Sequence, residues 1–165
     1  MHESVGFNMN LNKLLPKMFE QLDRQFTGYS NAASIERHAK EAGASACTDT
    51  SKLSMQDMKA DAVWLFEKIK LACNDYELCL IIANYGQGFS LYNDAVEYIK
   101  EENTHYKLHD DLVNMYFKVN DNNLRQVSIK NNVSYKTAQC AKQKLFKALD
   151  NERLAAESAI EKVLK

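Results

Sequence analysis

Residues 127–138 read VSIKNNVSYKTA, and this order of side chains matches what a helix-turn-helix requires. Because two helices cross closely in that motif, the first needs an apolar residue followed by a small one, here Val127 and Ser128. The turn needs a residue that tolerates left-handed backbone, and Asn132 is among the few that do. Asn132 stands where the motif usually has glycine, and the preceding position, usually apolar, is Asn131. The stretch therefore predicts two helices joined by a tight turn, with two departures from the usual pattern.

The second half of the stretch predicts how the second helix begins and packs. Val133 is expected to be the buried apolar plug of the turn, and Ser134 to cap the helix by accepting from its free amides. Ala138, Ala141 and Leu145 follow at three- and four-residue spacing, which predicts the buried stripe of this helix.

The same register leaves polar side chains on the outer face of the second helix. Lysine can contact phosphate or guanine, and glutamine can form two hydrogen bonds to adenine, so the face suits a DNA major groove. With the flanking cations, the candidate DNA-binding residues are Arg125, Lys130, Ser134, Tyr135, Lys136, Gln139, Lys142 and Gln143. The alternative is the solvated face of an ordinary helical hairpin.

The distribution of charge favours nucleic acid over that alternative. Residues 118–149 contain seven basic residues and one acidic residue, a net charge of +6, whereas the whole chain carries −1. The rest of the chain therefore carries −7. Positive charge gathered at one motif is expected of a nucleic-acid footprint.

Outside this motif the composition predicts helices. Among 165 residues there are five glycines and one proline, and strand-rich folds need turn residues far more often. We therefore predict an all-α fold, a compact multi-helix bundle with a C-terminal helix-turn-helix. Apolar spacing and turn residues place further helices at about 11–28, 31–42, 54–73, 76–85, 91–102 and 107–118.

Three units follow from this organisation. They are N-terminal helices with a polar linker (1–50), a central helical core (51–118), and the helix-turn-helix with its tail (119–165). The helix at 76–85 is apolar on most faces and should lie in the middle of the core. Trp64 lies near the apolar stripe of its own helix, so it is expected at the core or its edge.

The tail lacks helix-breaking residues. Neither Gly nor Pro occurs from Ser134 to the end of the chain, which predicts one helix of about 30 residues, roughly 45 Å long. Its apolar stripe needs a cover, and we expect docking on the first helix around Leu15, Phe19 and Leu22, with a bend at Asp150 and its neighbour. Self-association and contact with another protein are the alternatives.

Several classes of function are disfavoured. No apolar run approaches the roughly 18 residues of a membrane span, and the N-terminus lacks the order of a secretory signal, so a cytoplasmic protein is expected. The four cysteines show no metal or disulfide spacing, so buried free thiols are expected. His105 and His109 suit one helical face, but no third ligand is evident unless Asp110 or Asp111 supplies it. No catalytic arrangement is present, so we expect no enzyme, no metal and no cofactor.

A family resemblance adds to this interpretation. The segment 110–116, followed by a spacer and by residues 124–127 with their turn, is similar to the fourth conserved region of sigma factors. Bacteriophage Q-type antitermination proteins contain the same module. The chain resembles them in length, in an apolar helix ending at Tyr85-Gly86, and in a basic helix that runs into an Ala- and Glu-rich tail at 152–157. The resemblance covers roughly residues 60–165.

The resemblance implies a function and its partners. Such proteins bind double-stranded DNA near a phage late promoter, engage paused RNA polymerase and convert it to a form that reads through terminators, in the bacterial host cytoplasm. Some carry a zinc-binding cysteine cluster, which this chain lacks. The alternatives are a conventional helix-turn-helix regulator or sigma-like factor, and a helical protein-binding adaptor without DNA contact. Salt-dependent DNA binding would separate the adaptor from the others.

Overall fold

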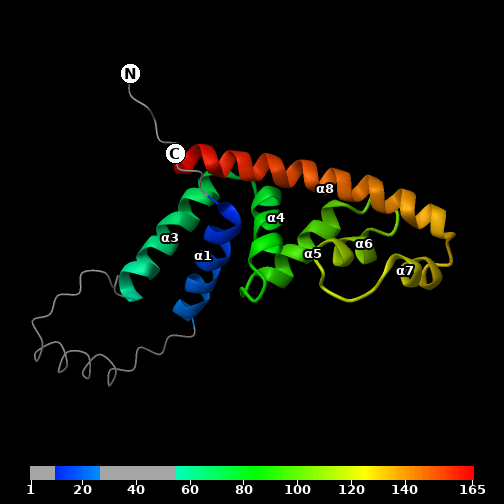
Figure 1. The fold of residues 1–165 in the computed structure, drawn as a ribbon, viewed down its shortest axis with the longest axis horizontal. Helices are drawn as coiled ribbons and strands as arrows, with labels where there is room; N and C mark the ends of the chain where they lie inside the picture. Colours follow the sequence, from blue (N-terminus) through cyan, green and yellow to red (C-terminus); the bar gives the residue numbers. More distant parts are fainter. Residues whose placement is uncertain (1–9, 27–54) are drawn as a thin grey trace, which may run out of the picture.

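The computed structural model describes residues 10–26 and 55–165, and every regular element in these ranges is an α-helix (Figure 1). The all-α prediction is confirmed. The expected helix at 31–42 and the polar linker lie outside the described residues. The helices are α1 (Leu11–Phe26), α3 (Met55–Ala72), α4 (Asp75–Tyr85), α5 (Tyr92–Glu102), α6 (His109–Tyr116), α7 (Leu124–Lys130) and α8 (Tyr135–Leu164).

Local sequence explains where several helices begin and end. Asn74 and Glu77 form a reciprocal capping box at the start of α4, each side chain accepting from the other residue's amide at 2.9 Å. Helix α6 is shorter than the helix predicted at 107–118. Leu108 and Lys118 on either side of it have φ of 61° and 55°, a left-handed backbone that an α-helix cannot include.

Two hydrophobic cores share α4 between them. The N-terminal core joins α1, α3, α4, the start of α5 and the end of α8, and the C-terminal core joins α4, α5, α6 and the first half of α8. Ile81 and Ile82 belong to the N-terminal core, whereas Leu80 and Ala83 belong to the C-terminal core. All four are buried, which confirms that the apolar helix lies at the centre of the molecule.

The long helix α8 runs the length of the molecule along one side and connects the two cores (Figure 1). Its 30 residues correspond to about 45 Å. Leu145 and Leu149 enter the C-terminal core, and Ala156 and Ile160 enter the N-terminal core. The predicted continuous tail helix is confirmed. The break in direction expected at Asp150 is not found, because the helix continues through this residue without interruption.

The predicted docking of the tail on α1 is only partly right. The end of α8 shares the N-terminal core with α1, but α8 as a whole packs more extensively on α4 and α3. Two polar contacts of one side chain join α1, α4 and α8. The hydroxyl of Tyr85 on α4 donates to the carboxylate of Glu157 on α8 at 2.6 Å and lies 3.0 Å from Oδ1 of Asn12 on α1.

Two expectations about burial are wrong. Trp64 is 59% exposed, because the core-facing stripe of α3 runs through Ala62, Leu65 and Ile69 and leaves the indole on the other side. The cysteines in the described ranges are free, as expected, but they are not buried. Cys140 is exposed on α8, whereas the other two are half-buried.

None of the helices within residues 10–26 and 55–165 combines the length and the apolar character that a membrane span requires.

Candidate nucleic-acid interface

The α7–α8 unit (residues 124–149) contains the turn that the sequence analysis singled out. Asn132 has φ of 52°, which confirms the predicted left-handed position. The amide of Val133 then donates to the carbonyl of Ser128 at 3.0 Å and closes the turn. Ser134 caps α8, because its hydroxyl accepts from the amide of Thr137 at 3.1 Å.

Packing in this unit follows the predicted stripe with one exception. Val127 and Ser128 on α7 are buried, and the apolar residues predicted for α8 are buried as well: Ala138, Ala141 and Leu145. Val133, expected to be the buried plug of the turn, is only half-buried. Leu124 packs against the C-terminal core near the start of α7, whereas Val133 joins neither core.

A polar latch joins α7 to α6. The ammonium of Lys130 lies 2.6 Å from one oxygen of Asp111, and the side-chain amide of Asn131 donates to the other oxygen at 2.8 Å. Asp111 is 7% exposed. Burial raises the pKa of this carboxyl, but the two hydrogen bonds and the charge of Lys130 outweigh burial, so the pKa is lowered overall. The latch explains why a polar residue occupies position 131.

Most candidate DNA-binding residues lie on the surface of the α7–α8 unit. The exposed ones are Arg125, Lys130, Ser134, Tyr135, Lys136, Gln139 and Gln143. Two of them have other contacts as well, since Lys130 belongs to the latch and the hydroxyl of Ser134 caps α8. Lys142 is half-buried, with its ammonium 5.1 Å from the centre of the Phe146 ring.

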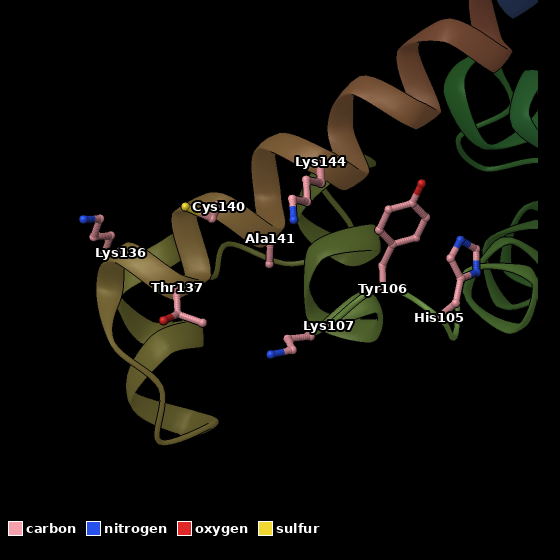
Figure 2. Close-up of a pocket in the computed structure, with 8 residues that line it drawn as sticks. All are labelled: His105, Tyr106, Lys107, Lys136, Thr137, Cys140, Ala141 and Lys144. Carbon is pink, nitrogen blue, oxygen red and sulfur yellow. The ribbon is translucent and has the colours of Figure 1, made fainter.

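A pocket beside α8 brings together residues that the sequence analysis did not combine (Figure 2). Its volume is about 490 Å³, and it lies between the α5–α6 connection and the first turns of α8. We call it the lysine pocket; its lining residues are His105, Tyr106, Lys107, Lys136, Thr137, Cys140, Ala141 and Lys144. Residues far apart in sequence form it, so spacing alone could not reveal it.

The two histidines considered as a metal pair have different surroundings. His105 lies against Tyr106 in the lysine pocket, with ring centroids 4.2 Å apart. His109 has its Nδ1 3.2 Å from the carbonyl of Tyr106 and its Nε2 3.4 Å from the carboxylate of Asp110. In the described part of the chain, no group of three or more His, Cys, Asp or Glu side chains is arranged to hold a metal ion.

A second hollow lies at the other side of the turn, where α7 meets the start of α8. Its volume is about 670 Å³, and Arg125, Ile129 and Tyr135 are among its lining residues. Ile129 is 71% exposed and Tyr135 is 53% exposed, so both side chains are accessible at this hollow. The surface of the α7–α8 unit thus combines cations, amides and apolar groups, the types of side chain that read DNA grooves.

Comparison with known proteins does not identify the chain: no family model, no curated protein and no solved structure matches it.

Proposed function

We propose that this chain is a sequence-specific DNA-binding transcription factor in which α7 and α8 act as a helix-turn-helix. The observation that carries the proposal is the exposed face at the start of α8, where Lys136, Gln139 and Gln143 follow a tight turn with a left-handed Asn132. Lysine and glutamine are suited to phosphate and base edges, and an α-helix fits the major groove.

Charge also supports the proposal. The segment 118–149, which includes this face, carries +6 in a chain whose net charge is −1. A positive surface on an otherwise acidic protein attracts a polyanion to one place and in one orientation.

The finer proposal is a phage or prophage antitermination protein that acts on RNA polymerase at a late promoter. It rests on the resemblance of residues 110–127 to the fourth conserved region of sigma factors and on the length and tail of the chain. In this proposal the α7–α8 unit binds DNA, and the acidic N-terminal half meets polymerase.

The decisive experiment is selection of bound sequences from a random duplex pool by the full-length protein. Enrichment of one motif, with affinity that falls steeply as salt rises, would support a sequence-specific factor. Failure to retain duplex DNA at low salt would exclude it and would favour a protein-binding adaptor. In vitro transcription through a terminator, on a template that carries the selected site, would then test antitermination against ordinary promoter regulation.

A further inference from the structure

We call the exposed surface of Lys136, Gln139 and Gln143 at the start of α8 the reading face. The lysine pocket contains positive charge in addition to that of the reading face. Lys107 comes from the α5–α6 connection, and Lys144 comes from α8. Figure 2 shows Lys144 and Lys107 on opposite sides of Ala141, with the Lys144 ammonium extending toward it. Lys136, which belongs to the reading face, also lines the pocket, so the two surfaces are continuous.

Some lysines of the described ranges are held in ion pairs, but the lysines of the pocket are not. Elsewhere Lys100 pairs with Glu97, and Lys130 pairs with Asp111. Within residues 10–26 and 55–165, no carboxylate lies within ion-pair distance of Lys107, Lys136 or Lys144. No acidic residue lines the pocket. Cations left unpaired around a hollow produce a local positive potential that favours an anionic ligand.

The pocket wall formed by the α5–α6 connection is held in place by buried hydrogen bonds. Asn103 is 4% exposed, and its side-chain amide donates to the Tyr76 hydroxyl at 2.9 Å and to the Ile99 carbonyl at 2.7 Å. The amide of Tyr106 donates back to the Asn103 carbonyl at 2.9 Å. Because the wall is already ordered, a ligand need not pay the entropic cost of ordering a loop.

We infer that the lysine pocket binds the sugar-phosphate backbone of duplex DNA beside the groove that α8 reads. The inference rests on the proposed function and extends it. Phosphates line both sides of a major groove, so a helix inserted there brings backbone against the structure beside it. A pocket of about 490 Å³ is large enough for more than a lone phosphate. Lys107 and Lys144 then supply contacts that position the protein without reading sequence.

The test compares salt dependence in two charge-matched double variants of the full-length protein. Lys107→Gln/Lys144→Gln changes the pocket, and Lys13→Gln/Lys17→Gln removes the same charge from the exposed side of α1. Affinity for a fluorescent random-sequence duplex is measured by anisotropy over a range of salt. Because each phosphate contact contributes about 0.9 to the slope of log affinity against log salt, the pocket variant should lose about 2 and the control almost nothing.

The result that overturns the inference differs from the result that overturns the proposed function. If the wild-type protein binds no duplex, both fail. If it binds with a steep salt slope that the pocket variant retains, only the inference fails. A melting curve by circular dichroism shows whether each variant is folded, and Lys107→Arg/Lys144→Arg should restore the slope if charge is the cause.

A second measurement separates DNA from a small anion as the ligand. Cys140 lines the pocket and is exposed, so its rate of alkylation, followed by peptide mass, reports occupancy. The duplex should slow alkylation of Cys140 in the wild-type protein, and less so in Lys107→Gln/Lys144→Gln. Equal protection by inorganic phosphate alone would mean a small-anion site and would overturn the assignment to DNA backbone.

Discussion

The ammonium of Lys130 lies 2.6 Å from the carboxylate of Asp111 and joins α7 to α6. Lys130 is 64% exposed in its side chain, whereas that of Asp111 is 9% exposed. The lysine thus reaches from the surface to an acid at the edge of the C-terminal core. The position of Lys130 on the proposed DNA surface therefore depends on its ion pair with Asp111. The other exposed cations of the α7–α8 unit have no such pair.

Removing the buried carboxylate should destabilise the protein. Asp111→Ala leaves the side-chain amide of Asn131 without one acceptor and removes the partner of Lys130, so we expect a loss of about 1–3 kcal/mol in the free energy of unfolding. Urea denaturation would measure it. The matched control is Asp110→Ala, whose exposed carboxylate should contribute under about 0.5 kcal/mol. Equal effects of the two variants would contradict the latch.

Because of the latch, the free energy of unfolding should also depend on pH in the acid range. The pKa of Asp111 is lowered in the folded protein, so the carboxylate contributes stability above its unfolded pKa of about 3.9. That contribution is lost as pH falls through the lower folded value. The stability difference between wild type and Asp111→Asn should therefore be constant near neutral pH and shrink below about pH 4. A constant difference down to pH 2 would show that charge is not its source.

Substitutions on the reading face should affect DNA binding and leave folding unchanged. Lys136→Ala should weaken binding to all sequences, whereas Gln139→Ala should reduce discrimination among sequences, by about 1–3 kcal/mol if it reads a base. Both side chains are exposed, so thermal unfolding should not change. Lys130→Ala is the contrasting variant, because it should alter both properties. A lower melting temperature in Lys136→Ala or Gln139→Ala would place that residue in the core.

Two substitutions test the packing of the α7–α8 unit. Leu145→Ala removes a fully buried side chain from the C-terminal core and should cost about 2–5 kcal/mol. Val133→Ala, at a half-buried position outside both cores, should cost clearly less, about 1 kcal/mol. Chemical denaturation compares the two. A larger loss from Val133→Ala would restore the interpretation of Val133 as the plug of the turn.

The last prediction concerns the tail. Deleting residues 152–165 removes Ala156 and Ile160 from the N-terminal core and takes away the carboxylate that accepts from Tyr85. Stability should fall by several kcal/mol, while the face at the start of α8 remains. Tyr85→Phe isolates the polar part and should cost about 1 kcal/mol. Full stability in the truncated protein would mean that the tail does not close this core.

The sequence predicted most of the helices because their signals are local. Three features of the turn each depend on neighbours within a few positions. They are the apolar residue followed by a small one at Val127, the left-handed Asn132 and the cap at Ser134. The same holds for the long helix, since absence of Gly and Pro from residue 134 onward is visible in the chain itself. These features follow from backbone sterics and hydrogen bonding over a few residues, which need no tertiary information.

Features that depend on distant partners were missed. In the sequence Asn131 is a departure from the motif. The structure explains it, because Asp111 on another helix accepts a hydrogen bond from its side chain. The lysine pocket joins residues 105–107 to the start of α8, a pairing with no sequence signal. The expected burial of Trp64 was wrong, because its position beside the apolar stripe of α3 does not show where the buried face of the helix ends. The one available clue is that Asp111 stands directly before the apolar pair Leu112 and Val113.

Because α8 is one uninterrupted helix, it sets the rotational phase between the proposed DNA-reading surface and the N-terminal half. Its first turns present the reading face, and its last turns pack in the N-terminal core. Each residue of an α-helix turns the chain by about 100°, so one residue inserted after Leu149 would rotate one end against the other by that angle, and seven would nearly restore it. The length of this helix therefore determines which side of a duplex, bound at that proposed surface, the N-terminal half would face.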